Sequence, residues 1–105
     1  MTLDQFAEGL ESLGLPMAYR EFSEGEVPVA PYFIYYALET EILYADGIVY
    51  DQRDNLCLEL YCDAKDPELE KKIETWLTQN ELAYRKEEAY IETEKYIEII
   101  YYTNV

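Results

Sequence analysis

The chain has 105 residues, of which 23 are acidic and 8 are basic, and with no histidine its formal net charge is -15. This balance excludes the usual kind of duplex-DNA binder, which displaces counterions with lysine and arginine. The missing histidine removes the side chain that most often serves as a general base or metal ligand near neutral pH. Hydrophobic residues make up 50% of the chain, too many for a disordered acidic tail. We therefore expect a single folded domain over residues 1–105 that works through its surfaces.

The first segment predicts an amphipathic helix over residues 3–13. A capping box is expected from Thr2 and Gln5, and Gly14 stands where the end of a helix favours a positive φ. The apolar side chains of the segment recur at helical spacing. These are Leu3, Phe6, Ala7, Leu10 and Leu13.

The next segments favour β-structure. A short extended piece is expected over residues 17–22, and a strand rich in β-forming residues over residues 32–39. The pair Asp46-Gly47 favours a tight turn, so we expect a short extra hairpin near residues 44–51, as an excursion from the main sheet. Residues 56–63 alternate strictly and predict a strand with one fully apolar face.

A second helix is predicted from Asp66, its N-cap, to Asn80, a plausible stop. Pro67 suits the first helical position, and Glu68 and Lys72 have the i,i+4 spacing of an ion pair on the outer face. The buried stripe is expected to contain the only tryptophan as a core residue. Its members are Leu69, Ile73, Trp76 and Leu77.

Two strands follow the second helix in the prediction. Residues 83–91 are mostly polar and suit the edge of a sheet, and residues 95–103 carry apolar side chains on one face. The resulting order is α-β-β-β-α-β-β. Helices and strands that are apolar on one face bury that face when both helices pack on one face of a mostly antiparallel or mixed sheet. We therefore predict an α+β fold.

The two cysteines, Cys57 and Cys62, fall within one predicted strand at an odd spacing. Their side chains are therefore expected on opposite faces, where they cannot bridge each other. The first six residues lack the basic start and apolar stretch of a secretion signal, and no apolar run approaches membrane-spanning length. Free thiols and these features favour synthesis in the reducing cytoplasm, with no membrane partner.

The acidic residues do not form a recognisable reactive site. Asp46, Asp51 and Asp54 depart from the calcium-loop pattern, and neither cysteine has a histidine to activate it. A glycosidase-like acid pair is left open by the sequence, but a deep sugar groove is hard to build in a chain of this size. We assign no catalytic residue, no cofactor and no metal ligand, and a small-substrate enzyme is the least favoured class.

The 12 tyrosines are more numerous than two small helices can cover. Aromatic side chains suit pleated strands, but tyrosine is also enriched in protein interfaces. We therefore expect at least one substantial protein interface. The candidate contact residues surround the predicted Asp-Gly turn, where aromatic side chains are least easily explained as core. They are Tyr44, Asp46, Tyr50 and Arg53.

Three stretches of the chain, taken together, resemble a family of small acidic proteins encoded by siphophages and prophages of Gram-positive bacteria. The stretches are Ala45–Tyr50, Leu58–Lys72 and Ala89–Tyr96, and the middle one, a strand followed by Lys-Asp-Pro-Glu-Leu-Glu at a helix start, is the most specific. The similarity extends from about Leu15 onward. These proteins look like tail-completion or tail-terminator proteins, which join head to tail.

The resemblance implies a ring, usually six-fold, made in the bacterial cytoplasm and then built into the virion at the head–tail junction. It implies contacts with the major tail tube protein and with a head-connector protein, and it supplies no catalytic motif. DNA would pass through such a ring without being bound, because a negative inner wall repels phosphates.

An acidic DNA-mimic inhibitor of a host nucleic-acid enzyme is the alternative. A mimic needs its carboxylates in spaced rows along one face. Basic residues interrupt the acids of this chain, which counts mildly against mimicry. They are Arg20, Arg53, Arg85, Lys86 and Lys95.

Overall fold

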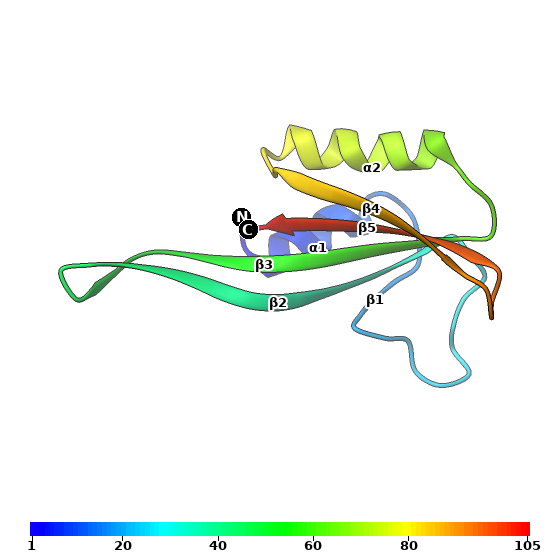
Figure 1. Cartoon of the computed structure of the whole chain (residues 1–105), viewed down its shortest axis with the longest axis horizontal. Coiled ribbons are helices and arrows are strands. Elements are labelled where there is room, and N and C mark those ends of the chain that lie inside the picture. Colours follow the sequence, from blue (N-terminus) through cyan, green and yellow to red (C-terminus); the bar gives the residue numbers. More distant parts are fainter.

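Two helices cover one face of a five-stranded sheet in the computed structural model, which describes all residues, 1–105 (Figure 1). The strands are ordered β1-β2-β3-β5-β4, with β1 parallel to β2 and every other pair antiparallel. The predicted α+β class and element order are confirmed, and the predicted edge strand is β4. The elements are α1 (Leu3–Glu11), β1 (Met17–Tyr19), β2 (Tyr32–Ala45), β3 (Ile48–Cys62), α2 (Pro67–Gln79), β4 (Tyr84–Ile91) and β5 (Tyr96–Asn104).

Both helices begin as their sequences predict. The Thr2–Gln5 capping box forms at α1, and the Asp66 side chain accepts a hydrogen bond from the Leu69 amide of α2 at 3.1 Å. Helix α1 ends two residues before its predicted end, because the chain tightens into i→i+3 hydrogen bonds after Glu11 and then reaches Gly14 at φ +84°. Neither helix is long and apolar enough to cross a membrane.

The core lies between the helices and the sheet. Alternate side chains of β2, β3 and β5 face the helices, as the strict alternation of residues 56–62 predicts. Twelve buried side chains form one continuous cluster. They are Phe6, Leu10, Phe33, Leu56, Leu58, Leu60, Cys62, Ile73, Leu77, Leu82, Ile99 and Tyr101.

The two helices also contact each other at the point where α1 has a glycine. The rings of Phe6 and Trp76 meet edge to face with centroids 5.4 Å apart. A Cβ atom placed on Gly9 would lie 2.3 Å from Cζ2 of Trp76, closer than packed carbon atoms approach. Gly9 therefore allows the close approach of α1 to the tryptophan ring of α2. Trp76 is half-buried at the margin of the core, rather than fully inside it.

Both cysteines are free and buried. Cys62 belongs to the core cluster, whereas Cys57 lies on the other face of β3, so the predicted placement on opposite faces is confirmed. Burial raises the pKa of the Cys62 thiol to about 11, which keeps it protonated near neutral pH. Its side chain packs among leucines as a small hydrophobic group.

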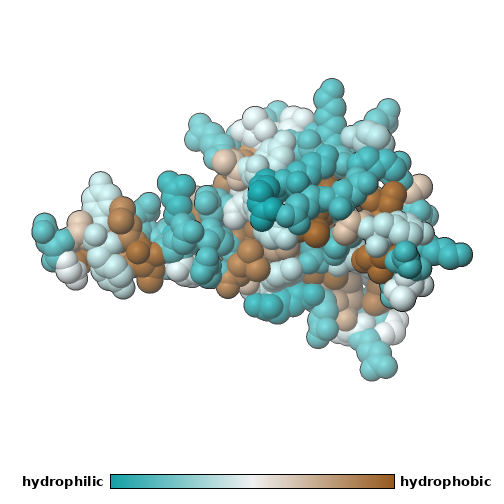
Figure 2. Space-filling view, in the orientation of Figure 1, coloured by the Kyte–Doolittle hydropathy of each residue, from teal (hydrophilic) through white to brown (hydrophobic).

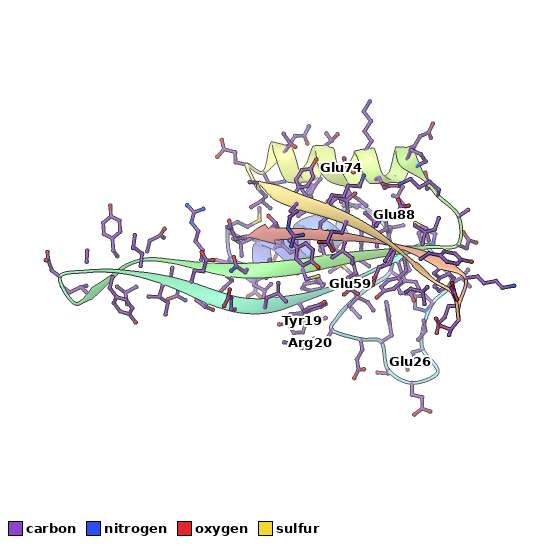
Figure 3. All side chains as sticks on the ribbon, viewed as in Figure 1. Tyr19, Arg20, Glu26, Glu59, Glu74 and Glu88 are labelled. Atoms are coloured by element: carbon purple, nitrogen blue, oxygen red, sulfur yellow. The ribbon has the colours of Figure 1, made fainter.

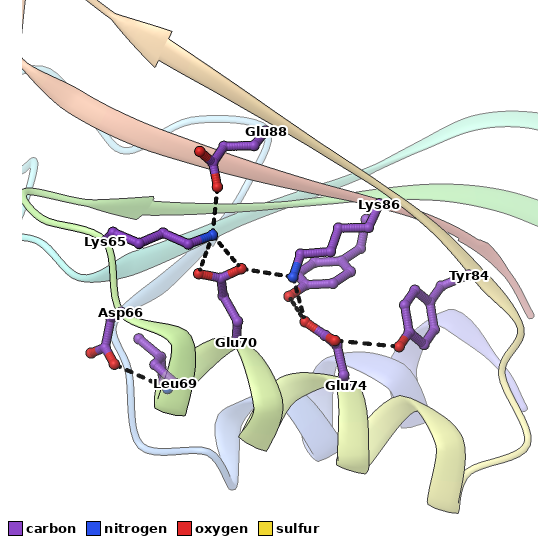
Figure 4. A network of polar contacts seen from close by, with 9 residues as sticks. Lys65, Asp66, Leu69, Glu70, Glu74, Tyr84, Lys86 and Glu88 are labelled. Atoms are coloured by element: carbon purple, nitrogen blue, oxygen red, sulfur yellow. Dashed lines mark hydrogen bonds and ion pairs between the residues drawn. The ribbon is translucent and has the colours of Figure 1, made fainter.

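A network of ion pairs ties α2 to β4 (Figure 4). The Glu70 carboxylate, 4% exposed, lies 2.9 Å from Nζ of Lys65 and 2.7 Å from Nζ of Lys86. Lys86 also contacts Glu74 at 2.9 Å, and Lys65 contacts Glu88 at 2.5 Å. Burial opposes a charge on Glu70, but hydrogen bonds from Lys86 and Lys65 outweigh it and lower the pKa of the carboxyl group.

The ion pair predicted between Glu68 and Lys72 does not form. Lys72 instead directs its ammonium group toward the Leu13 carbonyl oxygen, at 3.4 Å. The spacing along α2 permits the pair, but the loop after α1 lies beside this turn of the helix and offers Lys72 another acceptor.

Glu70→Gln is expected to lower the free energy of unfolding by about 2 kcal/mol, because two ammonium groups lose a buried carboxylate while each keeps one other partner. Since the folded-state pKa of Glu70 is lowered, its contribution is present above the ordinary carboxyl pKa, about 4.3, and is lost as the pH falls through the folded-state value. Urea unfolding at pH 7 and pH 3 measures both effects. Glu68→Gln, on the exposed side of the same helix, is the matched control and should change stability by less than about 0.5 kcal/mol.

Candidate protein-interaction site

Strands β2 and β3 continue well beyond the rest of the sheet. Strand β1 pairs only with residues 33–35 of β2, and β5 pairs with residues 55–62 of β3. Residues 38–54 form a ribbon, here called the arm, which projects to one side of the body (Figure 1). At its base Asp54 exchanges two backbone hydrogen bonds with Val105, and beyond Asp54 the ribbon has two strands only. It contributes to a long axis of 51 Å, against 30 and 24 Å for the other two.

The arm replaces the extra hairpin predicted near residues 44–51. The predicted turn is present, with Asp46 at φ 54° and Gly47 at φ 75°, the two positive φ values that a tight two-residue hairpin turn requires. Its flanking strands, however, are continuous with β2 and β3 and do not leave the sheet. The pairing of β2 with β3 continues to this turn through two register irregularities, one after Ala37 and one after Leu43.

The arm carries most of the exposed apolar side chains of the protein. Twelve large hydrophobic residues are exposed, and seven of them lie between residues 38 and 50. Figure 2 shows hydrophobic side chains between hydrophilic ones along the projecting arm. An isolated two-stranded ribbon is only marginally stable in water, and clustered exposed apolar side chains mark interaction surfaces. The seven are Leu38, Ile42, Leu43, Tyr44, Ile48, Val49 and Tyr50.

All four predicted contact residues lie on the arm. Tyr44 is 60% exposed and pairs in register with Val49, and Tyr50, at the neighbouring irregularity, is 74% exposed. Asp46 occupies the turn. Arg53 lies nearer the body, and its Nε is 3.5 Å from Oδ2 of Asp51. The arm thus brings Tyr44, Asp46 and Tyr50 together at its distal end and leaves Arg53 toward its base.

Five apolar residues of the arm were not among the predicted contacts: Leu38, Ile42, Leu43, Ile48 and Val49. Their sequence suits a strand whose apolar face is covered, which is the ordinary place for such residues. The sequence carries no signal that this face is left uncovered, because β2 and β3, at residues 32–45 and 48–62, extend beyond the strands expected from the sequence.

A polar surface, separate from the arm, lies on the sheet face opposite the helices. The Tyr36 hydroxyl donates to Glu59 at 2.7 Å, and the Tyr61 hydroxyl donates to the other oxygen of the same carboxylate. The Arg20 guanidinium lies 5.5 Å from the centre of the Tyr36 ring, and Figure 3 shows Arg20 and Tyr19 below the sheet near Glu59. Tyr36 and Tyr61 are therefore held by one carboxylate of the same chain.

Glu98 is a diagonal neighbour of Glu59 on this face, since Glu59 pairs with Ile100 and Glu98 pairs with Tyr61. Burial first, and then the negative charge of Glu59, raise the pKa of Glu98, and the nearby Tyr61 hydroxyl only partly offsets them. The ionised Glu98 therefore destabilises the folded protein at neutral pH.

Glu98→Gln is expected to raise the free energy of unfolding by about 0.5 to 1 kcal/mol at pH 7, because it removes one of two like charges on adjacent strands. The gain should shrink as the pH falls, since the raised folded-state pKa means that acid protonates Glu98 and removes the same repulsion in the unaltered protein. Denaturant titrations between pH 4 and pH 8 measure the difference. Glu92→Gln in the exposed β4–β5 turn is the control, and an equal gain there would assign the effect to net charge alone.

Neither a protein-family model nor the sequence of a curated protein matches this chain.

Proposed function

We propose that this protein is a structural subunit of a phage or prophage tail, a tail-completion or tail-terminator protein that assembles into a ring at the head–tail junction. The observation that carries the proposal is the arm, a ribbon with seven exposed apolar side chains on an otherwise strongly acidic molecule. Such a ribbon is stabilised when another protein covers it. The kind of assembly is proposed from the resemblance to tail-completion proteins. The stretches that carry this resemblance are Ala45–Tyr50, Leu58–Lys72 and Ala89–Tyr96.

The charge of the protein suits this role. Subunits with a formal net charge of -15 repel one another at low ionic strength, so assembly is favoured by salt, by a lower pH or by the end of a tail tube. In a ring the same charge repels the phosphates of passing DNA and prevents sticking. The proposed partners are further copies of the chain, the major tail tube protein and a head-connector protein.

The layout of the ion pairs favours this proposal over DNA mimicry. On the surface between α2 and β4, the carboxylates of Glu70, Glu74 and Glu88 are bound by Lys65 and Lys86. Carboxylates neutralised in this way do not present a row of phosphate-like charges.

The experiment that tests the function is a deletion of the gene in the phage or prophage that encodes it. We expect DNA-filled heads that remain unattached, beside tails of abnormal length or with an uncapped upper end, in electron micrographs of lysates. Expression of the intact chain from a plasmid should restore joined particles. Normal infectious particles after the deletion would contradict the proposal, and new sensitivity of these particles to host restriction would favour the DNA mimic.

A further inference from the structure

The helix layer carries an apolar hollow bordered by lysines. Leu13, after α1, and the half-buried Trp76 of α2 line a hollow of about 440 Å³, with Lys71 and Lys72 beside them. Glu68, Thr75 and Gln79 complete its wall on α2, so one carboxylate borders the hollow together with the two lysines. The hollow lies over the junction of the two helices, away from both the arm and the tyrosine-rich face of the sheet.

Four of the eight basic residues form no ion pair within the chain, and the two lysines at the hollow are among them; the other two are Arg20 and Lys95. Lys65, Lys86, Arg53 and Arg85 all form ion pairs within the chain. Lys71 and Lys72 form none, and the only polar contact of Lys72 is its hydrogen bond to the Leu13 carbonyl oxygen. With the Glu68 carboxylate on the same wall, the hollow carries two positive charges and one negative charge, a net positive site on a molecule with a formal net charge of -15.

The distal end of the arm has the complementary chemistry. Residues 42–52 carry exposed apolar and aromatic side chains together with two carboxylates; Asp51 is paired with Arg53 at 3.5 Å, and Asp46 in the turn forms no ion pair. An apolar surface with negative charges suits an apolar hollow with positive charges, and such matching selects the partner and the docking register.

The arm cannot reach the hollow of its own chain, because it projects away from the body and the helices (Figure 1). From residue 38 to residue 45 it extends by about 25 Å at roughly 3.3 Å per residue, a length sufficient to reach a neighbouring molecule. Because the arm and the hollow are different patches of the surface, contact between them is heterologous, and repeated heterologous contacts build a ring when the rotation closes.

We infer that the tip of the arm of one copy docks into the hollow of a second copy. Tyr44 and Tyr50 then lie against Trp76 and Leu13, and the Asp46 carboxylate lies near Lys71 and Lys72. This inference rests on the proposed ring function and supplies the contact that repeats around the ring. It assigns Trp76 and the two lysines to an interface that nothing in the sequence pattern marks.

Thr75→Tyr tests the hollow without changing the charge. Thr75 is exposed and lines the hollow, so the larger side chain should fill it and weaken self-association at least about tenfold in sedimentation velocity. Thr78→Tyr is the matched control, since Thr78 is exposed on the same helix but does not line the hollow. Equal dissociation constants for the two variants would overturn the inference.

The lysines are tested by Lys71→Gln with Lys72→Gln at physiological ionic strength, where we expect self-association to weaken about tenfold. The control adds the same two units of negative charge elsewhere, through Ser23→Glu with Thr93→Glu at exposed loop positions. An equal loss in the control would assign the effect to general repulsion and remove the lysines from the interface.

A mixture of two variants shows whether the arm of another copy occupies the hollow. Thr75→Tyr keeps its arm, and Tyr44→Ser with Tyr50→Ser keeps its hollow, so an equimolar mixture should form dimers of one chain of each kind that grow no further. If the unaltered protein assembles but the mixture forms no heterodimer, the arm-to-hollow contact is overturned and the ring proposal stands. If Thr75→Tyr assembles normally but no longer binds tail tube protein, the hollow serves that partner instead, which also overturns the inference. Failure of the unaltered chain to assemble at all would remove the ring proposal itself.

Discussion

Replacing Tyr44 and Tyr50 together by serine is expected to abolish self-association and head–tail joining while the monomer keeps its fold. Tyrosine side chains at the centre of an interface commonly contribute 2 kcal/mol or more each, so the pair is expected to weaken assembly by about a thousandfold. The two side chains are 60% and 74% exposed in the single chain, so their loss should change the free energy of unfolding by no more than about 0.5 kcal/mol. Light scattering and urea unfolding measure the two quantities.

Tyr90→Ser is the matched control for this double variant. Tyr90 is also 60% exposed, but it lies on β4, away from the arm. Its replacement should leave assembly intact. Loss of the circular dichroism signal in the Tyr44 and Tyr50 variant would show instead that these tyrosines hold the monomer together, and the site assignment would be wrong.

Gly9→Ala is expected to destabilise the protein by about 1 to 2 kcal/mol, although the same change within an exposed helix ordinarily stabilises by about 0.5 to 1 kcal/mol. The sign is reversed because the new Cβ atom would lie 2.3 Å from the ring of Trp76, so that the tryptophan or the helix must move. Movement of this ring also disturbs its edge-to-face contact with Phe6. Thermal and urea unfolding measure the change in stability.

A second protein, which lacks the tryptophan, tests whether Trp76 causes the reversed sign of this stability change. In a Trp76→Leu protein the same Gly9→Ala change should become neutral or stabilising, because the ring that it meets is gone. Glu8→Ala, one residue earlier on the exposed side of α1, should shift stability by less than about 0.5 kcal/mol. A stabilising Gly9→Ala in the unaltered background would show that α1 and α2 do not approach as closely as described.

Local signals predicted the framework of this fold. The capping residues Thr2 and Asp66 mark where the helices begin, and the alternation of residues 56–62 assigns the core face of β3. Helix ends and tight turns depend on interactions within a few residues, so one sequence is sufficient to find them. The Asp46-Gly47 turn was predicted for the same reason.

Features that depend on contacts between distant segments of the chain could not be predicted from such local signals. Glu68 and Lys72 have the spacing of a helical ion pair, but the position of the Leu13 carbonyl oxygen depends on how α1 packs beside α2. The exposure of the arm likewise depends on where β1 and β5 stop pairing. The sequence of an exposed apolar strand and that of a covered one are alike, so the five additional apolar side chains of the arm became visible only when its neighbours were placed.

The measurement that tests the assembly role most directly is the mass of the unaltered protein in solution across ionic strength, by light scattering, with and without tail tube protein. We expect the 12.4 kDa chain to be monomeric or loosely associated at low salt, and to close into a discrete ring, six-fold by the resemblance, at high salt or on tube ends. A species that remains at 12.4 kDa under every condition, tube protein included, would contradict the account.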